Sequence, residues 1–167
     1  MRESAASPLI RVATTADADA IWAMLKPVFR DGTTYALPRD IPRAAALEYW
    51  LGNGHRVFLA EQDDQPLGSY YLCANQRGGG AHVCNCGFVT AGHASGKGVA
   101  RAMLGHALET ARAAGFRAMQ FNFVIATNTR AIALWQANGF AEVGRLTGAF
   151  LHPDRGYVDA LVMYRAL

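Results

Sequence analysis

A short glycine-bearing segment, residues 95–100, carries the most distinctive chemistry in the sequence. It joins a strand-like stretch to a helix-like one, and it consists of Ser95, Gly96, Lys97, Gly98, Val99 and Ala100. At such a junction several main-chain N–H groups converge at the positive end of a helix dipole, which favours a bound diphosphate. Glycine lets the backbone approach a ligand closely and adopt positive φ. A plain tight turn is the alternative, and the spacing matches neither a Walker loop nor the three-glycine dinucleotide fingerprint.

Two asparagines stand out on otherwise apolar strands. Asn85 shares a strand face with Val89, and Asn122 shares one with Val124, because side chains alternate between the two faces of a strand. A buried amide is costly unless it is hydrogen-bonded. Each asparagine therefore either joins a structural network or receives a polar ligand.

Titratable side chains offer further chemistry. His82, His93 and Glu61 are candidates for a general base because their side chains can accept a proton. The alternative for each is a structural or solvated role. Cys84 or Cys86 could act as a covalent nucleophile, but no activating base adjoins either in the sequence. On one strand, His82 and Cys86 would stand about 13 Å apart, which is too far for one zinc ion. We therefore expect no metal.

The elements that must hold these residues alternate between strand and helix, which indicates an α/β fold. Thr14 and Asp17 have the spacing of a capping box, and Pro27 should kink or end the helix that follows. The strand 117–125 should run parallel to the strand 81–90 through a right-handed crossover. The other expected strands are residues 9–13, 57–61, 67–74, 141–146 and 157–164. One expected helix buries an apolar stripe at Ile21, Met24, Leu25, Val28 and Phe29. The other expected helices cover residues 44–51, 98–114 and 128–139.

Length and composition exclude several classes of protein. The chain has 167 residues and is 51% hydrophobic, so we expect residues 1–167 to form one domain. The net charge of +3 is spread along the chain, which does not indicate nucleic acid as a partner. No apolar run approaches the roughly 20 residues that cross a bilayer, and no signal-peptide h-region is evident. With the three cysteines read as reduced thiols, we expect a cytoplasmic protein that contacts no membrane.

Two motifs together resemble the GNAT superfamily of acetyl-CoA-dependent N-acetyltransferases. Residues 95–100 are similar to its acetyl-CoA-binding signature, Gln/Arg-x-x-Gly-x-Gly/Ala, except that Ser95 stands where the family usually has Gln or Arg. The stretch from Asn128 to Gly139 and Phe140 resembles the later motif, in which an asparagine precedes a short helix that ends in Gly-Phe. The resemblance implies a mixed, mostly antiparallel sheet with a central, splayed pair of parallel strands and helices on both faces.

The resemblance also implies how acetyl-CoA would be held. Its diphosphate would bind the main-chain amides of residues 95–100, and its pantetheine would lie between the splayed strands. Backbone groups of Phe88, Val89 and Thr90 would hold the pantetheine, with Val89 a catalytic candidate that polarises the thioester carbonyl. Asn128 would both cap its helix and contact the cofactor.

A further implication concerns the proton donor. Many members of the superfamily donate a proton from a tyrosine at the position that Trp135 fills here. An indole N–H is too weak an acid to replace it fully. Trp135 remains a catalytic and cofactor-contacting candidate, and we expect water or nearby N–H groups to stabilise the thiolate during direct transfer. A non-catalytic acyl-CoA sensor is the alternative that the missing tyrosine favours.

The acceptor is defined less sharply. The stretches FNFVIATN and LWQANGF, with EVGRL and GYVDALVMY, resemble the branch that acetylates small cyclic amines such as toxic proline analogues. That resemblance implies that Asn85 and Asn122 bind the carboxylate or ring of a small amino acid, with Asn122 also a catalytic candidate. A polyamine, an aminoglycoside-like amine or a protein N-terminus is the alternative, because the resemblance implies that the acceptor walls come from variable loops, here around residues 31–39 and 149–155. These loops show no acidic surface, which favours a weakly cationic substrate. Family resemblance also makes a homodimer plausible.

Overall fold

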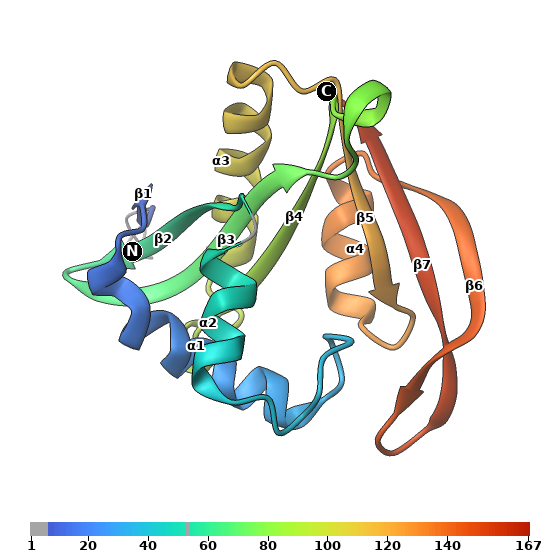
Figure 1. The fold of residues 1–167 in the computed structure, drawn as a ribbon, viewed down its shortest axis with the longest axis horizontal. Helices are drawn as coiled ribbons and strands as arrows, with labels where there is room; N and C mark the ends of the chain where they lie inside the picture. Colours follow the sequence, from blue (N-terminus) through green and yellow to red (C-terminus); the bar gives the residue numbers. More distant parts are fainter. Residues whose placement is uncertain (1–6, 53) are drawn as a thin grey trace, which may run out of the picture.

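The computed structural model describes residues 7–52 and 54–167, which build a seven-stranded sheet flanked by helices (Figure 1). The strand order is β1-β2-β3-β4-β5-β7-β6, in which β4 and β5 are parallel and the other neighbours are antiparallel. The strands are β1 (Leu9–Val12), β2 (Arg56–Gln62), β3 (Gln65–Ala74), β4 (Val83–Thr90), β5 (Ala118–Ile125), β6 (Ala141–His152) and β7 (Gly156–Ala166). The helices are α1 (Ala18–Asp31), α2 (Arg43–Leu51), α3 (Val99–Ala113) and α4 (Thr129–Ala137), with short 3-10 helices η1 (Thr15–Asp17), η2 (Gly78–Gly80) and η3 (Gly92–Ala94). The predicted fold class is confirmed.

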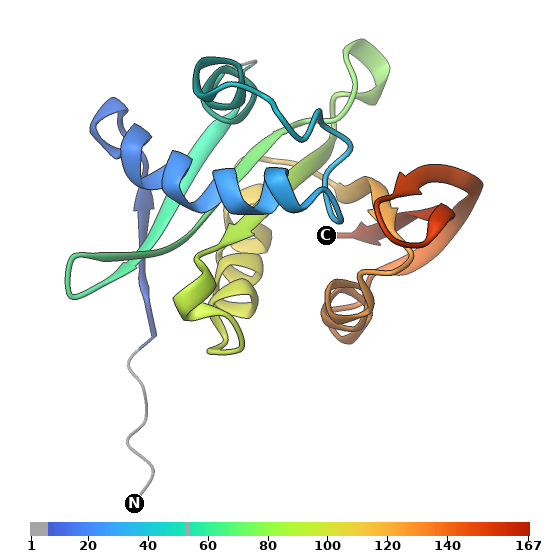
Figure 2. The same cartoon turned by 90° about the horizontal axis from the view of Figure 1, so that it is seen from below.

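Helices cover both faces of the sheet, with α1 and α2 on one face and α3 and α4 on the other (Figure 2). The stripe predicted for the first helix is packed inward, and Ile21 and Leu25 are fully buried. In α3 the apolar stripe is likewise buried, including Met103 and Leu104. Both helices therefore pack on the sheet with the apolar face that the spacing of their hydrophobic residues predicts.

The sheet separates in its middle. The parallel strands β4 and β5 pair at Val83–Ala118 and at Cys84–Met119, and both strands continue beyond these positions to Thr90 and Ile125. Over that length β4 stays paired with β3, and β5 with β7. The facing edges of β4 and β5 therefore diverge, which confirms the predicted splayed pair.

Some predicted boundaries differ from the structure. Of the two effects expected at Pro27, a helix end is excluded, because α1 continues to Asp31 and ends at Gly32, whose φ is 70°. Proline removes one helical hydrogen bond, and burial of Leu25 and Phe29 on either side of it keeps the helix on the sheet. The last two strands are longer than predicted because β6 and β7 pair along almost their whole length. Predictions that concern residues 1–6 and Asn53 fall outside the described residues.

Candidate active site

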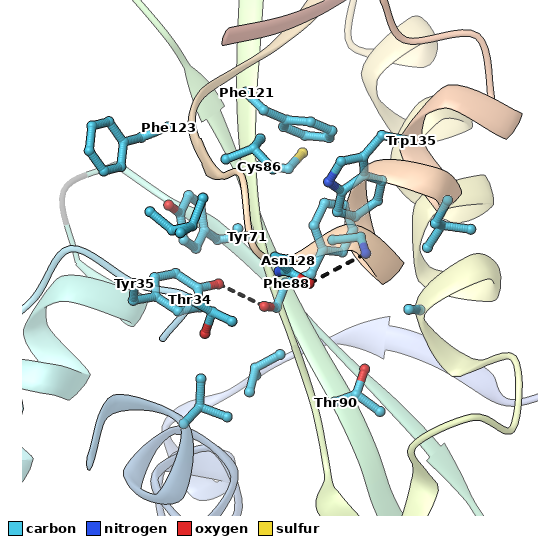
Figure 3. A pocket seen from close by; sticks show the side chains of 18 of the residues that line it. Thr34, Tyr35, Tyr71, Cys86, Phe88, Thr90, Phe121, Phe123, Asn128 and Trp135 are labelled. Carbon is cyan, nitrogen blue, oxygen red and sulfur yellow. Dashed lines mark hydrogen bonds between the residues drawn. The ribbon is translucent and has the colours of Figure 1, made fainter. Parts of the chain in front are cut away.

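The gap between β4 and β5 opens into a cavity of about 1120 Å³ (Figure 3). Its walls come from β4, β5, the start of α3, α4 and the loop between α1 and α2. Among the described residues that line it, the charged side chains are Arg101 and Arg130, and none is Asp, Glu, His or Lys. The cavity therefore favours a ligand that is anionic at one end.

Residues 95–100 form the turn that starts α3, as predicted. Gly96 and Gly98 adopt φ of 77° and 82°, a region that glycine enters without steric penalty. Gly98 is the N-cap of α3, so the amides of residues 99–101 have no helical carbonyl to bond. These residues also line the cavity, which leaves their amides available to an anion.

Two of the predicted amide donors are used within the turn itself. Ser95 N–H donates to Gly92 O and Lys97 N–H donates to Ala94 O, both at 3.3 Å. The Lys97 side chain is exposed, and Lys97 does not line the cavity. This geometry does not support the prediction that Lys97 contacts the cofactor. Its amide is already hydrogen-bonded within the turn, and its side chain faces solvent.

Arg130, at the start of α4, lies over the same turn. A Cβ added to Gly96 would stand 3.7 Å from Arg130 Nη2, and both residues line the cavity. A guanidinium in this place can supply the side-chain phosphate contact that Ser95 lacks. No local motif predicted it, because Arg130 reaches the turn from another helix.

The backbone of β4 presents alternate residues to the gap. β4 pairs with β3 without a register shift. At one end of this ladder the Val83 carbonyl accepts from Asn75 N–H, and at the other end Ala91 N–H donates to the Leu67 carbonyl. Because hydrogen-bonded positions alternate along an antiparallel pair, the main-chain groups of Val89 point at β3. Those of Phe88 and Thr90 point at the gap. The Val89 amide, which was predicted to polarise the thioester carbonyl, thus points away from the gap, and the neighbouring amide that faces the gap is that of Phe88.

Tyr35 joins the loop between α1 and α2 to this strand. Its hydroxyl donates to the Phe88 carbonyl at 2.7 Å (Figure 3), and its ring packs edge-on against Phe29 and Trp50. Burial raises the pKa of Tyr35, so the hydroxyl remains a donor. Sequence reasoning missed this tyrosine because its partner lies 53 positions away and no local pattern links the two.

Helix α4 brings Asn128 and Trp135 to the opposite wall. Asn128 caps the helix, its Oδ1 accepting from Ala131 N–H at 3.4 Å, which confirms the predicted cap. Trp135 is buried against Phe88 and Phe121, with ring centroids 5.2 and 4.7 Å apart. An apolar ring system thus fills the position at which a proton donor was sought.

Three asparagines line the cavity near the point where the strands diverge: Asn75, Asn85 and Asn122. Asn122 Nδ2 donates to Asn75 Oδ1 at 2.6 Å, and Asn122 Oδ1 accepts from Gln120 Nε2 at 2.9 Å. The structure thus brings the two predicted asparagines into one cavity. It adds Asn75, which follows the end of β3 and carried no signal in the sequence.

The face predicted for Asn122 is wrong. A β-bulge shifts the register of β5 between Phe121 and Val124, and both of these side chains are buried whereas Asn122 is exposed. A bulge inserts a residue and breaks the alternation of faces. Asn122 therefore does not share a face with Val124, and its amide points out at the cavity rim.

A wall of aromatic residues lies on the α1–α2 side of β4. Tyr71 Oη stands 3.2 Å from Tyr49 Oη, and the His55 ring stacks on Tyr71 with centroids 4.0 Å apart. A Cβ at Gly87 would lie 2.3 Å from Tyr71 Cε1 and 2.8 Å from its hydroxyl oxygen. Glycine at 87 therefore lets the Tyr71 ring lie directly over the backbone of β4, beside the amide that faces the gap.

The predicted base candidates lie elsewhere. Glu61 accepts two hydrogen bonds from Arg11, at 3.0 and 3.1 Å, on the outer strands. His82 and His93 are exposed, and neither lines the cavity. The structure therefore favours the structural or solvated alternative for all three, because the fold carries each side chain away from the gap.

The cysteines are poorly placed for nucleophilic chemistry. Burial raises the pKa of the Cys84 thiol to about 12 and that of Cys86 well above its ordinary value, so both stay protonated. Within residues 7–52 and 54–167, no three His, Cys, Asp or Glu side chains gather into a possible metal site. In the same part of the chain, no helix is both long and apolar enough to cross a bilayer.

Comparison with known proteins gives this site a context. The profile of the Acetyltransferase (GNAT) family matches residues 19–140. N-acetyltransferase aca1 of Schizosaccharomyces pombe is 36% identical over 97 residues, which are 58% of this chain and 46% of that protein. The match thus spans about half the length of that relative.

Solved structures match over nearly the whole chain. A GCN5-related N-acetyltransferase from Kribbella flavida is 38% identical, with a TM-score of 0.91 over 96% of this chain and 98% of that one. A phosphinothricin acetyltransferase from Sinorhizobium meliloti, in complex with AcCoA, shares the fold at 22% identity, with a TM-score of 0.84 over 97% of this chain and 89% of that one. Because the family profile covers more than half of the chain, the protein belongs to the acetyltransferase (GNAT) family.

Proposed function

We propose that this protein is an N-acetyltransferase that moves the acetyl group of acetyl-CoA directly to the amine of a small molecule. The observation that carries the proposal is the continuity of one cavity from the glycine turn at α3 to the gap between β4 and β5. A long thioester that carries phosphate at one end needs such a site. Family membership and the name of the fission-yeast relative support the same activity.

The residues present fit coenzyme A. The amides of residues 99–101, with those of Gly96 and Gly98, would hold the diphosphate, and Arg101 and Arg130 would neutralise its charge. The main-chain groups of Thr90, which face the gap, would bond the amides of the pantetheine. When bound, acetyl-CoA supplies an activated acyl carbon, and the thiolate it loses is the leaving group.

The chemistry of transfer then assigns tasks to the protein. The Phe88 N–H, fixed by the ladder between β3 and β4, would polarise the thioester carbonyl as charge develops on its oxygen. Holding the two reactants side by side supplies much of the acceleration. The high pKa values of Cys84 and Cys86 argue against an acetyl-cysteine intermediate, so the amine would attack the thioester itself.

For the acceptor, we propose a small amino acid or a cyclic amine. The amides of Asn75, Asn85 and Asn122 offer neutral donors for a carboxylate. The cavity lining that the structure describes has no carboxylate of its own to hold a polycation. Aromatic walls such as Tyr71 and Tyr49 suit a compact ring.

A panel of amines tests this function. Purified protein is mixed with acetyl-CoA and each amine, CoA release is followed, and binding of acetyl-CoA is measured by calorimetry. Cyclic imino acids and small amino acids should accelerate release, whereas spermidine and aminoglycosides should not. Binding of acetyl-CoA without release by any amine would instead identify a sensor, the alternative that Trp135 favours. An absence of binding would refute the whole assignment.

A further inference from the structure

Amide formation requires that the acceptor nitrogen lose a proton, and the cavity has few groups that could take it. Its described lining lacks Asp, Glu, His and Lys, and burial raises the pKa of its cysteine thiols. The tyrosines of the lining are Tyr35, Tyr49 and Tyr71. Tyr35 already donates its hydroxyl proton to the Phe88 carbonyl. The remaining pair is Tyr49 and Tyr71, whose hydroxyls contact each other.

Tyr71 is held in one place by three neighbours. His55 stacks on its ring, Trp50 packs edge-on with centroids 5.0 Å apart, and the bare backbone of Gly87 lies beneath it. Gly87 precedes Phe88, whose N–H faces the gap. The hydroxyl of Tyr71 is thus fixed beside the amide that would polarise the thioester, on the side of β4 opposite Trp135 (Figure 3).

Resting on the proposed function, we propose that Tyr71 is a catalytic residue that takes the proton of the acceptor amine while passing its own hydroxyl proton to Tyr49. The amine nitrogen bonds the acetyl carbon, and the C–S bond breaks with its electron pair on sulfur. The nitrogen's proton moves to Tyr71 Oη, the Tyr71 proton to Tyr49 Oη, and the Tyr49 proton to water. The thiolate takes a proton from water, so the products are an amide and a thiol.

The surroundings of Tyr71 favour this relay over a phenolate base. The titratable groups that face it are Tyr35, Tyr49, His55 and Cys73, and among the described residues around it there is no cation to stabilise a phenolate. Burial raises its pKa strongly, so the hydroxyl accepts a proton only as it releases another. Tyr49 is partly exposed, which gives the relay an exit to solvent.

The test compares Tyr71→Phe with Tyr70→Phe, the neighbouring tyrosine on the other face of the same strand, whose hydroxyl contacts His106 at 2.7 Å. With an amine that the unaltered enzyme acetylates, Tyr71→Phe should lower kcat about 100-fold, and Tyr70→Phe should leave it unchanged. Calorimetry should give the same Kd for acetyl-CoA, within about twofold, in all three proteins. The ratio of the unaltered enzyme's kcat to that of Tyr71→Phe should become smaller between pH 7 and pH 9, because hydroxide replaces the lost proton acceptor. Tyr49→Phe should lower kcat less, since water can take its place.

The outcomes separate two failures. If the unaltered enzyme releases CoA with the amine and Tyr71→Phe stays within about threefold of it, the relay is wrong and the transferase function stands. If Tyr71→Phe loses acetyl-CoA binding, its role is structural and the relay is also wrong. If the unaltered protein binds acetyl-CoA but no amine stimulates release, the transferase function fails, and the relay fails with it.

Discussion

The two ends of α3 allow a sharp test of the diphosphate cradle. Gly98 precedes the helix with φ of 82°, and Gly115 follows it with φ of 86°; a Cβ at either position would meet no atom within 4 Å. Replacing either glycine by alanine should therefore add the same strain, roughly 1–2 kcal/mol for an L-residue in the left-handed region. For a chain of this size, each variant should melt about 2–8 °C lower.

Cofactor binding should distinguish the two variants. Gly98 lines the cavity and Gly115 does not, so only the alanine at 98 would place a methyl group between the amides and the diphosphate. Calorimetry with CoA should show at least a tenfold weaker Kd for Gly98→Ala, about 1.4 kcal/mol, and an unchanged Kd for Gly115→Ala. Equal affinities in two equally destabilised variants would refute the cradle.

Other residues give further tests. Asn122→Ala should raise KM for the amine about tenfold, as expected for a lost hydrogen bond to a charged group, and leave KM for acetyl-CoA nearly unchanged; equal effects on both would contradict an acceptor role. Arg130→Ala should weaken CoA binding about tenfold at low salt and less at high salt, whereas Arg112→Ala, at the far end of α3, should bind normally. Hydrogen bonding to Arg11 lowers the pKa of Asp17 from 3.8 to about 2, so its stabilising effect is complete above pH 4 and is lost as the pH falls through 2. The melting temperature of Asp17→Asn should therefore fall less between pH 4 and pH 2 than that of the unaltered protein. An equal fall in the two proteins would contradict the role of Asp17.

The sequence was informative where a signal is local. The glycine turn, the Asn128 cap and the apolar stripes depend on neighbours within a few positions, so they could be predicted and the structure places them as expected. The order of strand and helix likewise follows from local periodicity. The family motifs then implied the splayed pair.

What could not be predicted depends on pairing across the fold. The direction of the Val89 amide is set by the register with β3, and the exposure of Asn122 by a bulge, neither of which composition reveals. Tyr35 and Tyr71 reach the gap through partners distant in sequence. For side chains considered by type alone, such as Glu61, the sequence left a catalytic and a structural role open, because residue type does not fix position in the fold.

The two bridges that join β4 to β5 have a mechanical consequence. The first four strands and the last three meet across a seam with few backbone hydrogen bonds. A ligand that binds in this seam and forms hydrogen bonds to both sides would hold the two halves of the sheet together. Occupancy of the seam then stabilises the folded chain in proportion to the logarithm of ligand concentration. If acetyl-CoA occupies the seam as proposed, the melting temperature of this protein should rise with the concentration of the cofactor.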